Sequence, residues 1–207
     1  EIEGIKCEVV PFYEFALGLW ETMKICGIDE AGRGPLAGPL HIAGCILNKQ
    51  IEGLKDSKKL SEKRREILYE EIIKNSTYKI VKFSAAQIDK FGLSKFLKLG
   101  LNELVDFFAP FEVKIIFDGN SKFGAEGFET MVKADDKIKE VSAASILAKV
   151  SRDRVMRNFD IKFPFYDFAK NKGYGSKAHI EAVQKYGYCE IHRKSFHLKH
   201  LQGILEF

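Results

Sequence analysis

The sequence predicts an α/β protein built on a mixed sheet. Apolar stretches of strand length recur along the chain and, after the first two, alternate with segments of helical periodicity. The clearest helical segment is 93–108, where apolar residues recur at intervals of three and four. Strands followed by helices that alternate with further strands are typical of a layered α/β domain. With 207 residues, the chain is long enough to bury a substantial core in one domain.

Five segments have the length and composition of β-strands. The first two flank a glycine-rich turn, and the third alternates polar with apolar residues, as a half-buried strand does. The fourth is a short apolar run that ends on Asp118, and the fifth leads into Asp135 and Asp136. The strands are predicted at residues 22–29, 40–47, 78–84, 113–118 and 128–133.

Four helices are predicted between and after these strands. Ser61 is a suitable N-cap for the first, because a serine hydroxyl accepts hydrogen bonds from free N–H groups at a helix start. Pro110 should stop the third, since proline cannot continue a helix. The fourth is apolar at its start and basic at its end. The helices are predicted over about 62–74, from Ser84 onward, over 93–108 and over 141–157.

Acidic residues fall where these strands end. Asp29 and Glu30 close the first, Asp118 closes the fourth, and Asp135 follows the fifth. Strand ends of a layered α/β sheet gather at an edge where ligands bind, so we expect these carboxylates to lie close together. Clustered carboxylates repel one another unless a cation is present, and Mg²⁺ prefers oxygen ligands. The pattern predicts a site for two divalent ions about 4 Å apart, the geometry used for phosphodiester hydrolysis.

The turn Gly32-Arg33-Gly34 after the first acids admits other interpretations. An Asp-Glu pair is often only a solvated turn. The glycine spacing, with Glu52 about twenty residues later, also resembles a dinucleotide-binding fingerprint. Pro39 would break the helix that this fingerprint requires, and the two acids would repel a pyrophosphate. We therefore favour a turn in which Arg33 and backbone N–H groups face a phosphate.

Charge and cysteine content narrow the class of protein. Residues 137–200 hold 14 Lys or Arg and 6 Asp or Glu, which fits a polyanionic substrate, although a solvated basic surface is the alternative. The four cysteines form no Cys-x-x-Cys pair, so zinc is not expected, and scattered reduced thiols suit a cytoplasmic protein. The apolar run 9–20 is too short to span a bilayer, so no membrane partner is expected.

A series of motifs runs in order along nearly the whole chain after its first residues. They are Asp29-Glu-Ala-Gly-Arg-Gly-Pro35, Asp56-Ser-Lys-Lys-Leu60, Phe117-Asp-Gly-Asn120, Lys133-Ala-Asp135, the run 142–153, Lys172-Gly-Tyr-Gly175 and His192-Arg-Lys-Ser-Phe196. Together they resemble the bacterial ribonuclease HII family. The resemblance implies a ribonuclease H-like fold, with a five-stranded mixed sheet flanked by helices and a helical C-terminal part. We expect 22–207 to form this single catalytic domain, and 1–21 to be an appended segment.

The resemblance also implies an activity. It is that of a metal-dependent endoribonuclease, using Mg²⁺ or Mn²⁺, that cleaves the RNA strand of RNA–DNA hybrids. The same enzymes cut duplex DNA on the 5′ side of an embedded ribonucleotide and leave 3′-hydroxyl and 5′-phosphate ends. Two other classes stay open: a module that binds hybrids without cutting, and a junction resolvase. The presence of all four acids disfavours the first, and the glycine turn with Tyr174 argues against the second.

Roles for individual residues follow from the same resemblance. The catalytic and metal-binding carboxylates would be Asp29, Glu30, Asp118 and Asp135, with Asp136 as the alternative to Asp135. The backbone of Gly32, Arg33 and Gly34 would read the ribose 2′-hydroxyl, and Tyr174 would pack against the neighbouring sugar. Backbone phosphates would be bound by Lys58, Ser145, Lys149, Arg193 and Lys194. Two departures from the family pattern are Ala134, where glycine is usual, and Lys194, where arginine is common.

The C-terminal tail carries one more pattern. Gln202, Leu205 and Phe207 resemble the short peptide by which bacterial replication and repair proteins dock on the sliding clamp. An extended tail could place its apolar side chains in a pocket of such a partner. The alternative is a tail folded back on its own core. We favour the alternative, because three loosely specified positions match easily by chance.

Overall fold

The fold is a five-stranded mixed sheet between two helical layers. In the computed structural model, residues 23–196 are described. The strand order is β3-β2-β1-β4-β5, with β1, β2 and β3 antiparallel and with β4 and β5 parallel to β1. The strands are β1 (Ile25–Ala31), β2 (Leu40–Leu47), β3 (Ser76–Phe83), β4 (Lys114–Asp118) and β5 (Glu129–Met131). The sequence-based prediction of five strands in a mixed sheet is therefore confirmed.

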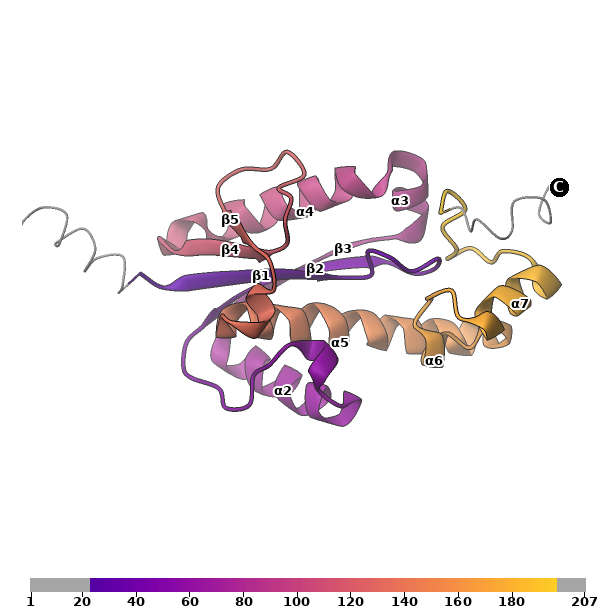
Figure 1. Ribbon diagram of the computed structural model, residues 1–207, viewed down its shortest axis with the longest axis horizontal. Coiled ribbons are helices and arrows are strands. Elements are labelled where there is room, and N and C mark those ends of the chain that lie inside the picture. Colours follow the sequence, from indigo (N-terminus) through magenta and orange to yellow (C-terminus); the bar gives the residue numbers. More distant parts are fainter. Residues whose placement is uncertain (1–22, 197–207) are drawn as a thin grey trace, which may run out of the picture.

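Helices cover both faces of this sheet, α3 and α4 on one side and α2 and α5 on the other (Figure 1). Glycines allow the close approach on each face. A Cβ atom at Gly27 would lie 2.2 Å from the backbone of Glu140 in α5, and one at Gly44 would lie 2.4 Å from the Phe108 ring in α4. The helices are α2 (Glu62–Asn75), α3 (Ala85–Phe91), α4 (Leu93–Phe108), α5 (Lys139–Lys162), α6 (Phe168–Asn171) and α7 (Lys177–Tyr186).

Local signals explain where several helices begin and end. Ser61 accepts a hydrogen bond from the Arg64 N–H at 3.3 Å, and Ser84 forms a reciprocal capping box with Gln87. Gly92, at φ 83°, separates α3 from α4. Four short 3-10 segments complete the structure: η1 (Ser57–Lys59), η2 (Ala109–Phe111), η3 (Ala134–Asp136) and η4 (Pro164–Tyr166).

Some predicted bounds were wrong. The helix expected over 141–157 runs from Lys139 to Lys162, because its apolar side chains continue into a third buried cluster beyond the sheet. The strand expected over 128–133 pairs only at Glu129–Met131. The first strand is Ile25–Ala31 and so continues past Asp29 instead of ending there.

The helical C-terminal part lies at the far end of α5 (Figure 1). Its chain returns to the glycine-rich turn after β1, where the Gly38 N–H donates to the Ile191 carbonyl at 2.8 Å and the Arg193 N–H donates to the Leu36 carbonyl at 2.7 Å. Ala37 and His192 form an isolated β-bridge there. This pairing joins the last described residues to the loop that follows the acids.

Two further expectations bear on the described residues. Cys26, Cys45 and Cys189 are free thiols, as expected, whereas Cys7 lies outside residues 23–196. Within the same range, no helix combines the length and apolarity that crossing a membrane requires. The appended segment 1–21 and the tail with Gln202, Leu205 and Phe207 lie outside the described residues.

Candidate active site

Three carboxylates from three parts of the sheet come together beside α5. Gly27 of β1 pairs with Ile116 of β4, so Asp29 and Asp118, two residues farther along each strand, point to the same face. Asp135 arrives from η3, just after β5. Ligand oxygens of the three all lie within 4.8 Å of one another. The structure thus brings together three of the four predicted carboxylates.

Glu30 is the exception, and the strand geometry explains it. Since β1 keeps its pairing with β2 through Ala31, Glu30 projects to the face opposite Asp29 instead of bending toward it. Glu30 nevertheless lines the same cavity of about 370 Å³ as Asp29 and Asp118. Its Oε2 atom is buried and accepts no hydrogen bond from the described residues. Burying a carboxylate oxygen without a donor is costly, and coordination of a cation would remove that cost.

Burial and mutual repulsion shift the pKa values of these acids upward. Burial raises the pKa of Asp29 well above its usual range, with Glu30 adding to the effect. Burial also raises the pKa of Glu30, although Arg33 opposes the shift. Burial, Asp118 and Asp56 together raise the pKa of Asp135 to about 6. These buried carboxylates are difficult to ionise together, and all their ligand atoms are oxygens. Both properties suit a hard divalent cation, whose positive charge would stabilise the ionised carboxylates.

The structure separates Asp135 from its neighbour Asp136. The side chain of Asp135 is buried, with 4% of the residue exposed, and it belongs to the group of three. Asp136 is exposed and forms an ion pair with Lys59. Asp118 is fixed against the same turn, because its Oδ1 accepts the Ala134 N–H at 3.0 Å. The geometry therefore favours Asp135 as the ligand and leaves Asp136 outside the cluster.

Asp56 is a site residue that sequence reasoning missed. Its carboxyl group raises the pKa of Asp135, and its Oδ1 accepts the Lys58 N–H at 2.9 Å. Asp56 thereby joins the segment 57–59 to the carboxylate cluster. The only signal in the sequence was its place at the start of the motif that contains Lys58, since no strand end or acidic neighbour marks it.

Polar and basic groups line the cavity on the side of α5 and η1. The predicted phosphate contacts Lys58, Ser145 and Lys149 all lie there. Burial lowers the pKa of Lys58, but the surrounding carboxylates, Asp56 foremost, outweigh it and raise the pKa above its usual range. Ser145 Oγ lies 2.9 Å from Ser57 Oγ.

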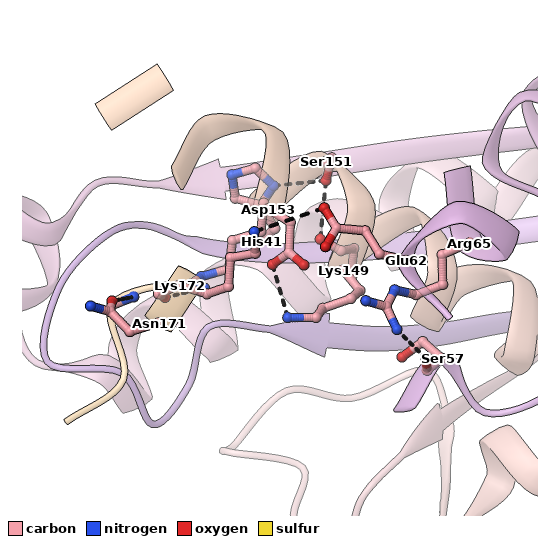
Figure 2. A network of polar contacts seen from close by, with 12 residues as sticks. His41, Ser57, Glu62, Arg65, Lys149, Ser151, Asp153, Asn171 and Lys172 are labelled. Carbon is pink, nitrogen blue, oxygen red and sulfur yellow. Dashed lines mark hydrogen bonds and ion pairs between the residues drawn. The ribbon is translucent and has the colours of Figure 1, made fainter. Parts of the chain in front are cut away.

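Lys149 is already paired within its own helix. Its Nζ donates to Asp153 at 2.8 Å, as Figure 2 shows, and burial lowers its pKa. Arg65 supports the segment that carries Lys58, since its guanidinium donates to the Ser57 carbonyl at 2.9 Å (Figure 2). Of the lysines in this cavity, Lys58 thus faces the carboxylates and Lys149 is held by Asp153.

The glycine turn and Tyr174 form the other wall of the cavity. Gly32 has φ 96°, and a Cβ atom there would lie 2.4 Å from the Pro39 carbonyl, so no other residue fits. At Gly34 the space is open, with Tyr174 Cε1 4.0 Å from where a Cβ would stand. Tyr174 is 48% exposed. Arg33 lies 3.6 Å from Glu30 and stacks over the Phe123 ring at 5.1 Å.

Comparison with known proteins decides the family. The family described as ribonuclease HII matches residues 26–199, which is most of the chain. The chain belongs to the ribonuclease HII family. As a member it is a ribonuclease H, a hydrolase with endonuclease activity. Ribonucleases H use divalent metals, and the carboxylate cluster fits such an ion.

Individual relatives agree with this assignment. A ribonuclease HII from Campylobacter hominis is 99% identical over 185 residues, which cover 89% of this chain and 100% of that relative. A solved structure of the PCNA:RNase HII complex from Archaeoglobus fulgidus superposes with a TM-score of 0.70 at 28% identity, covering 86% of this chain and 96% of that one. Ribonuclease H2 from Pyrococcus horikoshii gives 0.64 at 31% identity, covering 88% and 97%. The predicted ribonuclease H-like fold is confirmed.

Two residues predicted to bind backbone phosphates, Arg193 and Lys194, do not line the carboxylate cavity. Arg193 is 1% exposed, and its guanidinium donates to the carbonyls of Gly32 and Gly38, both at 2.7 Å. Burial lowers its pKa to about 9, and nearby Arg152 adds to that shift. Its donors serve the backbone, so the structure shows Arg193 supporting the glycine turn, and its phosphate contact stays a prediction. Lys194 is exposed but lies outside the carboxylate cavity, and its backbone N–H donates to Asp89.

Proposed function

We propose that this enzyme cleaves the RNA strand of RNA–DNA hybrids and cuts duplex DNA on the 5′ side of an embedded ribonucleotide. The products would carry 3′-hydroxyl and 5′-phosphate ends. One observation supports the proposal above others: the acids Asp29, Glu30 and Asp118, the glycine turn and Tyr174 line a single cavity of about 370 Å³. Groups suited to phosphodiester hydrolysis and groups suited to reading a sugar therefore share one site.

The carboxylates would hold the metal. Asp29, Asp118 and Asp135 supply oxygens within 4.8 Å of one another, and Glu30 supplies the buried oxygen that lacks a donor. Bound Mg²⁺ or Mn²⁺ ions would supply a nucleophile from water and neutralise the charge on the scissile phosphate. The protein contributes rigidity, since the Glu30 N–H donates to Asp29 Oδ1 at 2.7 Å and the Ala134 N–H fixes Asp118. Ligands fixed before substrate arrives need no reorganisation during the reaction.

Lys58 contributes positive charge beside the acids. It lies in the same cavity, and Asp56, Asp29 and Asp135 hold it in its charged form. A lysine ammonium so placed is suited to a phosphate next to the scissile one, where it would orient the backbone. Ser145 lies against Asp29 and would position that carboxylate. Both residues therefore act beside the carboxylates, on the phosphate side of the cavity.

The glycine turn and Tyr174 would distinguish ribose from deoxyribose. The 2′-hydroxyl is the group by which a protein tells RNA from DNA at a given position. Backbone without a side chain at Gly34 can approach a sugar closely, and the Tyr174 ring faces that gap. A sugar held between the turn and the ring would present its 2′-hydroxyl to the backbone groups of 32–34. A deoxyribose at this position, which has no 2′-hydroxyl, would lose this contact.

A substrate panel tests the proposal. The enzyme is incubated, with Mg²⁺ or with EDTA, on an RNA–DNA hybrid, a DNA duplex with one ribonucleotide, an all-DNA duplex and a four-way DNA junction. We expect Mg²⁺-dependent cleavage of the first two only. Binding of the hybrid without cleavage would indicate a binding module, and cleavage of the junction would indicate a resolvase. Either result would contradict the proposed activity.

Clamp docking by the tail is a second candidate role, set against the favoured alternative of a tail that packs on the core. The Archaeoglobus fulgidus relative is described in complex with PCNA. Gln202, Leu205 and Phe207 lie outside the described residues, and clamp docking rests on their spacing. If the tail docks on a sliding clamp, deletion of 202–207 abolishes clamp binding and leaves the melting temperature and cleavage of naked DNA unchanged. A clear fall in melting temperature would show instead that the tail packs on the core.

A further inference from the structure

Two buried histidines form a hydrogen-bonded relay that ends on the backbone of Tyr174. His192 Nδ1 lies 3.0 Å from the Cys189 backbone nitrogen, and His192 Nε2 lies 3.0 Å from His179 Nε2. His179 Nδ1 lies 2.8 Å from the Tyr174 carbonyl oxygen. The relay therefore spans from the last described segment to the loop that carries the proposed sugar-reading ring.

The direction of each hydrogen bond in the relay follows from the two ends. A backbone N–H can only donate, so His192 Nδ1 accepts and its ring proton lies on Nε2. His179 Nε2 must then accept that proton, which leaves the His179 proton on Nδ1, where it donates to the Tyr174 carbonyl. Both rings are neutral in this arrangement. His192 Nδ1 also lies 3.1 Å from the Cys189 Sγ atom, so every ring nitrogen of the relay has a partner.

Burial supports this arrangement. His179 is 0% exposed and His192 is 3% exposed. The rings of Tyr166 and Phe168 pack against both histidines, with ring centroids 5.0 to 6.3 Å apart. Fully satisfied polar groups inside an apolar surround hold one geometry, because any displacement leaves a buried donor or acceptor unpaired.

Tyr174 depends on its backbone for its position. Among the described residues, no hydrogen bond holds its hydroxyl and no aromatic ring stacks on it. Its carbonyl accepts the His179 and Ser176 donors, both at 2.8 Å, and its N–H donates to the Asn171 carbonyl at 2.9 Å. Where the half-exposed ring stands in the cavity is thus set by how the backbone is tethered.

The residue after His192 tethers the opposite wall. Arg193 donates to the carbonyls of Gly32 and Gly38 and so holds the glycine turn. Its neighbour His192 contacts His179, which holds the Tyr174 loop. The two walls also touch directly, where the Leu36 N–H donates to the Gly173 carbonyl at 2.8 Å. Arg152 of α5 also donates to the Ala37 carbonyl on one wall and to the Lys172 carbonyl on the other. The separation between turn and ring is therefore fixed jointly by residues 192 and 193, by Arg152 and by this direct contact.

We propose that His179 and His192 are positioning residues for ribonucleotide selectivity, which hold Tyr174 at a fixed distance from the Gly32-Arg33-Gly34 turn. The inference rests on the proposed role of Tyr174 as a sugar-reading residue. Neither histidine touches substrate, and both act through the Tyr174 carbonyl. Their loss should affect cleavage at a single embedded ribonucleotide, where one sugar must be aligned, more than cleavage of a long hybrid.

Two substitutions at His179 separate positioning from packing. His179→Asn keeps an amide donor where Nδ1 stands, and His179→Leu removes it. Leucine is the better buried helix residue, so packing alone predicts that asparagine is the more damaging change. A positioning role predicts that leucine lowers selectivity more than asparagine does. Selectivity is measured as kcat/KM on the embedded ribonucleotide divided by kcat/KM on a long hybrid with Mn²⁺. Melting temperatures of both variants record any loss of folding.

The same ratio is measured in a Tyr174→Ala background. We expect His179→Leu to lower it about tenfold, less than the roughly hundredfold that a full 1 Å misplacement can cause. His179→Asn keeps the donor to Tyr174 but loses the acceptor for His192, so it should lower the ratio clearly less than His179→Leu does. In the Tyr174→Ala background, His179→Leu should have no further effect.

The outcomes separate the two claims. An unchanged ratio in His179→Leu, or an equal further loss in the Tyr174→Ala background, would overturn the positioning role alone. If Tyr174→Ala reduces cleavage of both substrates equally, the sugar-reading role of Tyr174 fails and the positioning role falls with it.

Discussion

Asp135→Asn should make the metal-free protein more stable and remove most of its response to Mg²⁺. The Asp135 carboxylate lies within 4.8 Å of its partners Asp29 and Asp118. Two unit charges at that distance repel by about 3.5 kcal/mol at an effective dielectric constant of 20 and by about 1 kcal/mol in bulk water. Asparagine removes the charge and has nearly the same shape. We therefore expect a gain of about 1 to 3 kcal/mol at pH 8 in EDTA.

Thermal unfolding measures this gain. For a chain of this size, 1 kcal/mol shifts the melting temperature by roughly 2–4 °C, so Asp135→Asn should melt several degrees above wild type in EDTA. Saturating Mg²⁺ should stabilise wild type, by about 2.7 kcal/mol at a hundredfold excess over Kd, and should stabilise the variant far less.

Asp136→Asn is the matched control. It removes a neighbouring carboxylate that pairs with exposed Lys59, so it should leave the Mg²⁺ response intact and change the melting temperature little, because an exposed ion pair contributes little to stability. If Asp135→Asn melts below wild type in EDTA, or keeps the full Mg²⁺ response, the assignment of this carboxylate as a crowded metal ligand is refuted.

Three further predictions concern activity, substrate choice and pH. Asp118→Asn should abolish cleavage while the fold stays intact, and near-normal cleavage at saturating Mg²⁺ would contradict its assignment as a ligand. Tyr174→Ala should lose about a hundredfold on a single embedded ribonucleotide and much less on a long hybrid with Mn²⁺, since one misaligned sugar can cost that much; an equal loss on both would make Tyr174 a packing residue. Because burial, Asp118 and Asp56 raise the pKa of Asp135 to about 6, cleavage at subsaturating Mg²⁺ should fall as the pH drops from 8 through 6. The same shift has the opposite sign for stability in EDTA: folded Asp135 holds a proton that the unfolded state releases, so its contribution to stability is greatest below about pH 4 and declines as the pH rises through 6. The melting-temperature gain of Asp135→Asn over wild type should therefore grow from pH 4 to pH 8, and a gain that shrinks over this range would contradict the shift.

The fold could be predicted because its signals are local. Period-two and period-three-to-four patterns mark the strands and α4, and Ser61 and Ser84 mark helix starts through their own side-chain hydrogen bonds. Of α6 and α7, the family resemblance predicted no more than a helical C-terminal part. With four residues, α6 is too short to show a period, whereas α7 buries His179, Ala182 and Val183 at helical spacing.

The site was predictable only in part, for physical reasons. Strand ends correctly placed Asp118, but the continued pairing of β1 with β2, which directs Glu30 to the opposite face, depends on register across the sheet. A basic residue in a basic segment looks the same whether it binds phosphate or backbone. Arg193 turned out to hold carbonyls of the glycine turn, which only the folded chain brings near it.

The most direct test of the proposed site is to map the cut at a single ribonucleotide. A DNA duplex with one embedded ribonucleotide is labelled at either end of that strand and incubated with Mg²⁺. The products are sized on a denaturing gel and tested for extension by a polymerase. The proposal predicts one cut immediately 5′ of the ribonucleotide, an extendable 3′-hydroxyl, a 5′-phosphate on the ribonucleotide, and no cut with Asp118→Asn. A cut on the 3′ side, or the same cut in EDTA, would contradict it.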